Sequence, residues 1–370
     1  MERWRYVAKT TGAELPVTTR KIKNLTGPGE TTRFGMEATD LGIPVRMPDG
    51  RLLFLFGDTF KEARVGGGDW RAPVGLISTT GNLAAGVMFA VAAGSDTAYA
   101  RQLLSYQHGA SIHGKHVSTI LPTDTLVLRN SIYMHVMVCQ GLGNVLWTEI
   151  HVSRDNAKTW AKVGSDIPGD KWAGRFQMIS WAQGDDGFVY IVSTGFQRDK
   201  GLLLSRVPAA QIADHKAYQP WGYKNNGWAW GNEPSEVLTG RFGELNLRRI
   251  ENHWILTFFD AEKYRIDALV LPSPVANLFT APRLTVCQGG AWGGESDSVV
   301  AQLYGGYVIP GSTLKNCHFV ISQWNTQNNW PYRSMQFASD LSGAGSRFER
   351  IDRTERTERT ERTERIKRIE

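Results

Sequence analysis

Residues 41–56 read LGIPVRMPDGRLLFLF, two apolar runs separated by the turn residues Pro48, Asp49 and Gly50. Proline presets the backbone of a turn, aspartate bonds to nearby backbone amides, and glycine accepts left-handed conformations. The stretch therefore predicts a β-hairpin with strands over 41–45 and 52–56.

The same strand–turn–strand pattern recurs along the chain. Its further members are 125–128 with 132–138, 178–181 with 188–192, 245–250 with 254–259, and 299–303 with 307–309 and 317–323, the last with a turn at Gly305–Gly306. The modules begin near residues 38, 118, 176, 242 and 299. A quasi-repeat of that length, with about four strands per unit, predicts an all-β fold, namely a five-bladed β-propeller with loop insertions. A pair of β-sandwiches is the rival, but it does not require such regular spacing.

Residues 153–160, SRDNAKTW, are similar to the Asp-box of sialidase-like propellers, with Ala157 where that motif usually has glycine. The motif is a structural turn between outer strands. It therefore supports the fold and carries no prediction about catalysis.

Composition excludes several classes of protein. The 370 residues are 41% hydrophobic and 21% charged, which is typical of a globular protein with a full core. The net charge of +6 is spread along the chain, so no nucleic-acid partner is expected. No window approaches the ~18 apolar residues of a membrane span. Thirteen tryptophans and 39 glycines favour a β-rich protein that handles carbohydrate.

Cysteine usage and the termini add further expectations. Cys139, Cys287 and Cys317 lack metal-ligand spacing, so three buried thiols are favoured over one disulfide. The first residues, MERWR, do not resemble a signal peptide. We expect residues 1–345 to form one propeller domain, and residues 346–370, where Arg-Thr-Glu repeats, to be a helical or disordered tail.

Four carboxylic acids stand at predicted strand ends among apolar residues: Asp40, Asp58, Asp124 and Glu244. Burying such groups is costly unless they are paired or used. Glycoside hydrolysis needs two carboxyl groups, one protonated and one ionised. The alternative for each acid alone is a turn or cap role.

Other chemistries lack support in the sequence. No GxSxG motif is present, and Gly66–Gly68 is followed by neither Lys-Ser/Thr nor a helical pattern, so acyl transfer and phosphate binding are not indicated. His113 and His116 have no acidic third ligand at a usual spacing. We therefore expect no metal and no cofactor, and we interpret the two histidines as loop residues that contact substrate.

A Gly/Asn-rich segment, residues 220–231, carries Trp221, Tyr223, Trp228 and Trp230 just before Glu244. Core packing is the alternative, but this density of rings favours a stacking platform for sugar faces. Further tryptophans that could extend the platform are Trp292, Trp324 and Trp330.

Seven short motifs resemble, in order, those of the actinobacterial endo-D-arabinanase family, which occurs in bacteria and their phages and was long catalogued as a domain of unknown function. They are TDLGIP (39–44), LFGDTF (55–60), WRAPVG (70–75), ILPTD (120–124), WAWG (228–231), RFGEL (241–245) and YGGY (304–307). The likeness covers roughly residues 20–342. It implies a five-bladed propeller that cleaves internal α-D-arabinofuranosyl linkages in arabinogalactan and lipoarabinomannan of the cell envelope.

The resemblance implies that Asp40 and Asp58 are the essential acid pair, with Glu244 as a third acid, and leaves the order of acid and base open. The expected substrate-binding residues are Asp124, His113, His116, Trp221, Trp228, Trp230, Trp292, Tyr304 and Trp324. The chain departs from the family in its tail, in the missing signal peptide, and at Val308-Ile309-Pro310, where a histidine before the proline is expected.

The sequence thus favours an extracellular or cell-wall-acting monomer whose partner is envelope arabinan, delivered by a phage or lacking its leader. A non-catalytic, adhesin-like propeller that binds the same polymer is the alternative. A sialidase-like enzyme would need a cluster of arginines for a carboxylate, and only Arg241, Arg248 and Arg249 form an inner-strand group.

Overall fold

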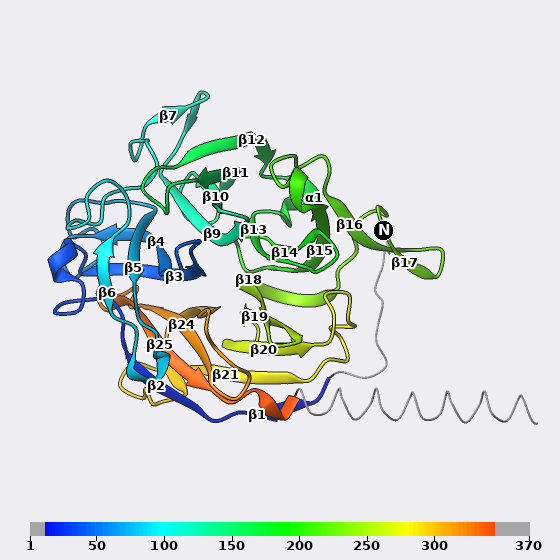
Figure 1. Ribbon diagram of the computed structural model, residues 1–370. Coiled ribbons are helices and arrows are strands. Elements are labelled where there is room, and N and C mark those ends of the chain that lie inside the picture. Colours follow the sequence, from blue (N-terminus) through cyan, green and yellow to red (C-terminus); the bar gives the residue numbers. More distant parts are fainter. Residues whose placement is uncertain (1–11, 345–370) are drawn as a thin grey trace, which may run out of the picture.

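Strands dominate the computed structural model, which describes residues 12–344 (Figure 1). Helical structure in this part is short: the 3-10 turns η1 (Thr32–Phe34), η2 (Leu83–Ala85) and η3 (Ala209–Gln211), the four-residue α1 (Lys171–Gly174), and residues 342–344 at the end of the described chain. The all-β prediction is confirmed. The predicted Arg-Thr-Glu tail lies outside the described residues.

The strands form antiparallel meanders that follow chain order. One sheet holds β3 (Ala38–Arg46), β4 (Leu52–Phe60), β5 (Val74–Ser78) and β6 (Phe89–Ala92), and the next holds β9 (Thr119–Leu128), β10 (Ser131–Cys139), β11 (Val145–Ser153) and β12 (Ala161–Pro168). An 11-stranded sheet contains two meanders, joined where β15 pairs with β18: β13 (Met178–Gln183), β14 (Phe188–Thr194) and β15 (Lys200–Pro208), then β18 (Leu238–Ile250), β19 (His253–Asp260), β20 (Arg265–Leu271) and β21 (Arg283–Gly290).

The last four-stranded sheet brings the two ends of the described chain together. It contains β23 (Leu303–Val308), β24 (Cys317–Trp324) and β25 (Tyr332–Ser339), and its outer strand is the N-terminal β2 (Thr19–Asn24). Short strands complete the sheets: β1 (Glu14–Pro16) and β22 (Val299–Ala301) beside β21, the hairpin β16 (Gln219–Lys224) and β17 (Gly227–Trp230), and the hairpin β7 (Ser111–Ile112) and β8 (Lys115–His116).

The first strands of the meanders lie nearest one another at the centre of the molecule (Figure 1). In cyclic order β3 contacts β9, then β13, β18 and β23 follow, and β23 contacts β3 again. Hydrogen bonds of side chains join neighbouring meanders, among them Leu247 N to Ser180 Oγ (2.7 Å), Val308 N to Asn246 Oδ1 (2.9 Å) and Leu41 N to Ser322 Oγ (2.9 Å). Sheets far apart in sequence are thereby held around one axis.

A buried ion pair between Asp124 and Arg248 connects three of these inner strands. Asp124 on β9 is fully buried and accepts Nη1 and Nη2 of Arg248 on β18, at 2.9 and 2.5 Å. It also accepts the hydroxyl of Ser180 and the backbone amide of Trp181 on β13, the latter at 3.0 Å. Because every one of these donors comes from another sheet, the pair fixes the relative positions of β9, β13 and β18.

Most of the predicted hairpins are present, and one predicted turn is wrong. Gly305–Gly306 lies inside the continuous strand β23, where the register shifts between Gly305 and Tyr307. A Cβ on Gly306 would lie 2.7 Å from a methyl group of Ile266, so glycine here serves close packing and a bulge rather than a reversal.

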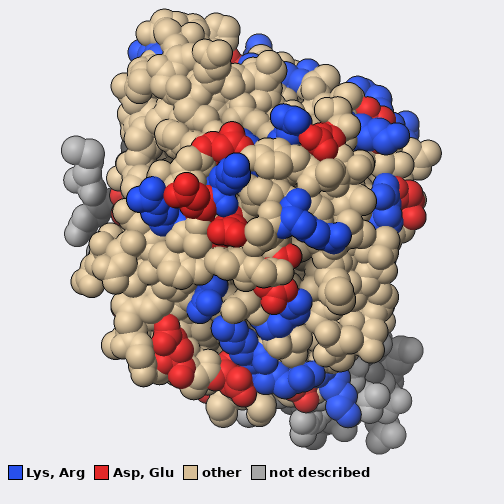
Figure 2. Space-filling view, turned by 90° about the vertical axis from the view of Figure 1, so that its left-hand side faces the viewer, with Lys and Arg blue, Asp and Glu red and all other residues tan. Residues whose placement is uncertain are grey.

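The Asp-box-like segment forms the predicted turn between β11 and β12. Asp155 Oδ1 accepts the amides of Lys158 and Thr159 at 3.1 and 2.9 Å, and Ala157 takes a left-handed φ of 65° where the motif usually has glycine. The three cysteines are buried and free, as expected. Basic and acidic side chains are interspersed over the face in Figure 2, in line with the even spread of charge along the sequence.

Stability should depend strongly on the Asp124–Arg248 pair. We expect Asp124→Asn to lower the free energy of unfolding by about 3–5 kcal/mol, because it leaves a buried guanidinium uncompensated. The matched control is Asp185→Asn, which breaks the neighbouring pair with Arg249; because Asp185 is 85% exposed, we expect a much smaller loss there. Denaturant unfolding monitored by tryptophan fluorescence measures both, and equal losses would contradict the assignment.

Candidate active site

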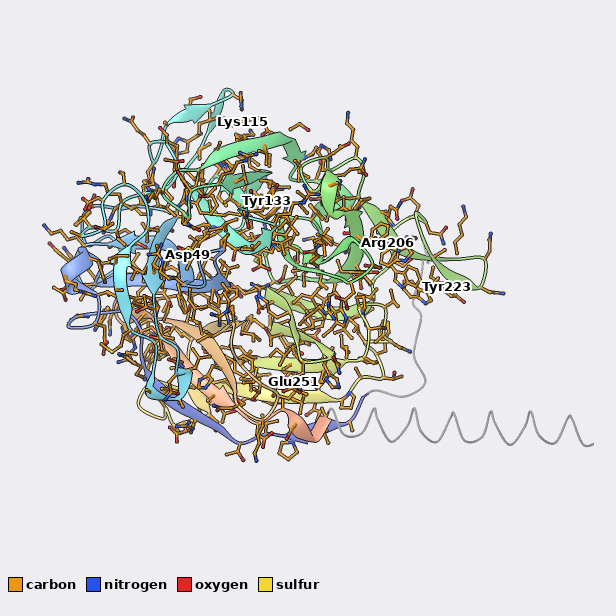
Figure 3. The ribbon with its side chains drawn as sticks, viewed as in Figure 1. Asp49, Lys115, Tyr133, Arg206, Tyr223 and Glu251 are labelled. Atoms are coloured by element: carbon orange, nitrogen blue, oxygen red, sulfur yellow. The ribbon has the colours of Figure 1, made fainter. Side chains whose placement is uncertain are left out.

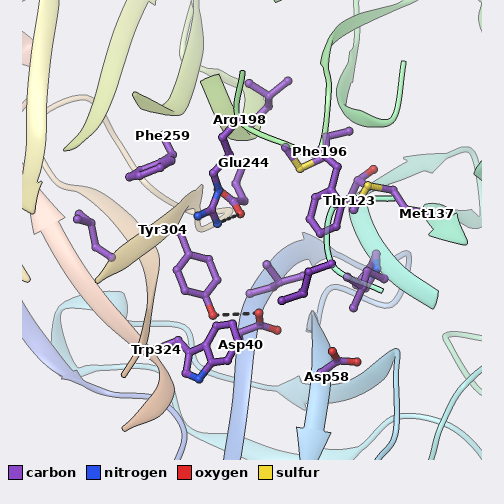
Figure 4. Close-up of a pocket in the computed structure, with 18 of the residues that line it drawn as sticks. Asp40, Asp58, Thr123, Met137, Phe196, Arg198, Glu244, Phe259, Tyr304 and Trp324 are labelled. Carbon is purple, nitrogen blue, oxygen red and sulfur yellow. Dashed lines mark hydrogen bonds and ion pairs between the residues drawn. The ribbon is translucent and has the colours of Figure 1, made fainter. Parts of the chain in front are cut away.

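A cavity of about 550 Å³ opens where the inner strands meet (Figure 4). Its lining comes from all the meanders and includes Asp40, Asp58, Thr123, Glu244 and Tyr304. Cavities of this size suit small ligands or a few sugar units. Three of the four acids singled out in the sequence therefore meet in one place.

Asp40 and Asp58 face each other across the β3–β4 pairing. Between the pairs Thr39–Thr59 and Leu41–Phe56, β4 carries one extra residue, so Gly57 and Asp58 together oppose Asp40. Such a bulge redirects side chains next to functional sites. The eighteen-residue spacing of the two acids in the sequence thus becomes direct proximity on adjacent strands.

A similar bulge on β18 positions Glu244. Between the pairs Phe242–Asp260 and Leu245–Phe258, β18 carries one extra residue, within Gly243-Glu244. Both sites read Phe-Gly-acid in the sequence, at Phe56 and at Phe242. This repeated tripeptide is the feature of the sequence that marks both bulges and their acids.

The two bulge glycines make room for charged groups. A Cβ on Gly57 would lie 2.4 Å from Asp40 Oδ1, and one on Gly243 would lie 2.9 Å from Cγ of Arg198. Each glycine therefore allows a functional side chain to lie against the backbone of a neighbouring strand.

Asp40 is held protonated near neutral pH. Burial raises its pKa to about 8, and the carboxylate of Asp58 adds to the rise, while hydrogen bonds from Tyr332 and Tyr304 oppose it. The Tyr304 hydroxyl donates to Asp40 Oδ2 at 3.0 Å, and Oδ1 is buried without a partner within residues 12–344. Asp40 lines the cavity, and a protonated carboxyl group at such a place can donate its proton to a ligand.

Asp58 is oriented by two donors on one oxygen. Its Oδ1 accepts Nε1 of Trp70 at 2.8 Å and Oγ1 of Thr119 at 2.6 Å. Burial raises the pKa of Asp58, and these two hydrogen bonds and the nearby His108 act against the rise. The second oxygen, Oδ2, is left for the cavity.

Glu244 lies on the other side of the cavity with Arg198 (Figure 4). Arg198 Nη2 donates to Glu244 Oε1 at 2.5 Å, and Glu244 Oε2 is a buried oxygen for which the described chain offers no partner. Arg198, from the β14–β15 loop, has a left-handed φ of 56° and lies over the rings of Phe259 and Tyr304. The sequence carried no signal for it, because only the fold brings that loop to β18.

Of the other expected substrate-binding residues, Tyr304 and Trp324 line the cavity. Trp292 does not line it; its Nε1 donates to Gln302, a lining residue, at 3.1 Å. Asp124 is a correction: it is fully buried, its oxygens are occupied by donors from β13 and β18, and it is absent from the lining. In this structure it is a buried anion of the fold that lies outside the cavity lining.

The rings of the predicted aromatic platform lie on a hairpin outside the cavity, and their contact with sugar stays a prediction. Trp221 and Trp230 face each other across the β16–β17 hairpin, and Tyr223 faces Trp228. These rings pack on one another and on Arg206, at the outer edge of the molecule (Figure 3). Cross-strand aromatic pairs of this kind stabilise a hairpin, and none of the four lines the cavity.

His113 and His116 lie on the exposed β7–β8 hairpin, whose tip at Lys115 is peripheral in Figure 3. Neither histidine lines the cavity, and their contact with substrate stays a prediction. Residues 12–344 contain no group of three or more His, Cys, Asp or Glu that could hold a metal ion. They also include no helix long and apolar enough to cross a bilayer.

The fold is similar to that of β-propeller glycoside hydrolases. A candidate hydrolase from Bacteroides ovatus ATCC 8483 matches with a TM-score of 0.59 and 11% identity, over 84% of this chain and 87% of that chain. CoXyl43, a GH43 β-xylosidase/α-arabinofuranosidase from a compost microbial metagenome, matches with a TM-score of 0.52 and 9% identity, over 87% and 94%. At such identities the likeness establishes the fold alone.

The chain belongs to the family described as Domain of unknown function (DUF4185), whose profile matches residues 26–338. A relative from Mycolicibacterium smegmatis, an uncharacterized 35.9 kDa protein in the asd 3′ region, is 29% identical over 328 residues, which is 83% of this chain and 94% of the relative.

The raised pKa of Asp40 predicts a pH-dependent stability difference. In the folded protein this group binds its proton more tightly than at the unfolded value of 3.8, so its contribution is complete at low pH and is lost as pH rises towards about 8. Asp40→Asn lacks this loss. We expect the unfolding free energy of the variant relative to wild type to rise between pH 4 and 8, by up to about 1.4 kcal/mol per pH unit.

The control for that measurement is Asp49→Asn, because the hydrogen bond from Arg51 lowers the pKa of Asp49. The free energy of unfolding of Asp49→Asn relative to wild type should not change with pH above pH 5. If that of Asp40→Asn relative to wild type does not change either, the pKa of Asp40 is not raised by folding.

Gly57→Ala should displace the Asp40 carboxyl group. We expect overpacking to lower the free energy of unfolding by about 1–3 kcal/mol. We also expect the variant to lose the fall in stability between pH 4 and 8 that Asp40 causes in wild type. Gly81→Ala is the control, since nothing lies within 4 Å of a Cβ at that position. Unchanged pH dependence in Gly57→Ala would contradict the proposed close contact.

Proposed function

We propose that this protein is a glycoside hydrolase whose catalytic groups are Asp40, Asp58 and Glu244. The observation that carries the proposal is the convergence of a protonated carboxyl group, Asp40, and an oriented one, Asp58, on one cavity. Glycosidases divide the roles of proton donor and ionised partner between two such groups. The fold shared with glycoside hydrolases supports the assignment.

In the proposed reaction Asp40 gives its proton to the leaving glycosidic oxygen as the bond from that oxygen to the anomeric carbon breaks. Asp58 acts through Oδ2, either on the anomeric carbon directly or by taking a proton from the water that attacks it. In both courses one water is consumed, and the carboxyl groups regain their starting protonation. Glu244 and Arg198 form a compensated charge pair that faces the same sugar.

We propose internal α-D-arabinofuranosyl linkages of envelope arabinogalactan and lipoarabinomannan as the substrate. The supporting residues are the motifs around Asp40, Asp58 and Glu244, which resemble those of endo-D-arabinanases. One structural neighbour, CoXyl43, is named as a β-xylosidase/α-arabinofuranosidase. A cavity in which Arg198 is already balanced by Glu244 favours an uncharged sugar over an anionic one.

We further propose that the meanders are the blades of a five-bladed propeller, in which β2 completes the last blade. The cyclic contacts of β3, β9, β13, β18 and β23 support this count. Action at the cell envelope, as a monomer released or delivered by a phage, fits a wall polymer as substrate and is part of the proposal.

The test is incubation of the full chain with arabinogalactan and with lipoarabinomannan, measuring reducing ends and fragment length. We expect a ladder of short arabinan fragments from wild type and at least a ~10²-fold lower rate from Asp40→Asn and Asp58→Asn. Asp185→Asn is the folded control. The pKa of Asp40 predicts that kcat/KM declines as pH rises through about 8.

Each outcome bears on the proposal. Binding of the polymer without new reducing ends in wild type would replace the hydrolase by a carbohydrate-binding propeller. Full activity in either carboxamide variant would remove that residue from the catalytic pair. The anomer of the first product, read by NMR, distinguishes a retaining from an inverting course.

A further inference from the structure

We propose that Trp70 and His108 are positioning residues that hold Asp58 in its reactive orientation. The inference rests on the proposed role of Asp58 in glycoside hydrolysis. Neither residue is among the acids that carry the chemistry, and His108 never touches Asp58 by a hydrogen bond. Its action passes through the indole of Trp70.

The first step is the contact between Trp70 and Asp58. Trp70 Nε1 and Thr119 Oγ1 both donate to the same oxygen of Asp58, Oδ1. Rotation of the carboxyl group would break both hydrogen bonds at once. Oδ2 is therefore the oxygen presented to the cavity, and its direction depends on where the indole lies.

The second step is that Trp70 needs external support. It lies in the glycine-rich connection after β4 and is 39% exposed, so the core does not fix its ring. Its plane is set by stacking: the ring of His108 lies 3.9 Å away at 16°, and that of Phe60 lies 6.1 Å away at 24°. The much closer His108 is the main support of the indole face.

The third step is the anchor of His108 itself. Its Nδ1 lies 2.8 Å from the carbonyl oxygen of Ser118, and since a carbonyl can only accept, Nδ1 carries the proton. Ser118 directly precedes Thr119, the other donor to Asp58. The contacts therefore close a ring of five residues, which we call the Asp58 clamp: Asp58, Trp70, His108, Ser118 and Thr119.

The clamp explains how loops far apart in the sequence can determine one carboxylate. Asp58 comes from β4, Trp70 from the following loop, and His108 and Thr119 from the segment that leads into and begins β9. Misplacing a reacting group by about 1 Å can cost 10²-fold in rate. A positioning role thus predicts an effect on kcat with little effect on KM, because the sugar-binding surface is unchanged.

The kinetic test compares Trp70→Phe, His108→Ala and His108→Phe with wild type on arabinogalactan. We expect kcat to fall about 10- to 100-fold in Trp70→Phe and His108→Ala, with KM within about twofold. His108→Phe keeps a stacking ring and loses the anchor to Ser118, so it should recover part of the rate. Loss of the Trp70 hydrogen bond should raise the pKa of Asp58 and move the acidic limb of the pH–rate profile to higher pH.

A second measurement does not depend on activity. In protein labelled with ¹⁵N-tryptophan, the indole resonance of Trp70 is identified by its absence from Trp70→Phe. We expect it to shift with pH as Asp58 ionises, to lose that titration in Asp58→Asn, and to move or broaden in His108→Ala. His253→Ala, at the start of β19 and outside the cavity lining, is the histidine control.

The two readouts separate the two proposals. If no glycan is cleaved by wild type but the Trp70 resonance responds as expected, the positioning contact stands and the hydrolase proposal fails. If glycan is cleaved while His108→Ala leaves kcat, the pH profile and the Trp70 resonance unchanged, the positioning role is overturned. Thermal unfolding of each variant excludes global misfolding as the cause of a lost rate.

Discussion

The buried ion pair of Asp124 and Arg248 is the interaction on which the arrangement of the inner strands depends. A buried carboxylate is tolerable only when its lone pairs are occupied; here the amide of Thr125 on β9 donates to the acid, and the remaining donors come from β13 and β18. Satisfying one charge therefore requires three strands to meet at fixed distances. The cavity that holds Asp40, Asp58 and Glu244 forms where those strands meet.

Irregular backbone, rather than regular strand, presents the candidate catalytic groups. Extra residues interrupt the pairing at Gly57-Asp58, at Gly243-Glu244 and at Thr123 on β9. Leu41, next to Asp40, and Arg198 both take left-handed φ values, of 64° and 56°. Such departures cost stability unless the surroundings enforce them, and they concentrate at functional sites. The regular outer strands supply the packing that holds these exceptions in place.

Electrostatics divides the three acids into different roles. Asp40 lacks a cationic partner, so burial and its neighbours favour its neutral form. Asp58 has two neutral donors on one oxygen, and Glu244 has the guanidinium of Arg198. The same kind of side chain thus occurs as a carboxyl group of raised pKa, a carboxyl group oriented by two donors and a charge paired with a guanidinium, because each lies against a different set of neighbours.

The sequence by itself determined the all-β fold, the repeat of hairpins and the turn at residues 153–160, because alternation and turn residues are local features. It also marked four strand-end acids, and the resemblance to a known family singled out Asp40 and Asp58 among them. It placed a turn at Gly305–Gly306, where the structure has a bulge inside a strand, because the two have the same local composition. For the same reason it did not separate the buried Asp124 from the acids of the cavity, or the tryptophans of the β16–β17 hairpin from rings that line the cavity. Only the tertiary structure decided which acids share a cavity and added Arg198, Trp70 and His108. Those groups act through contacts between segments tens to hundreds of residues apart, and such distances are set by packing of the sheets rather than by any neighbouring residue.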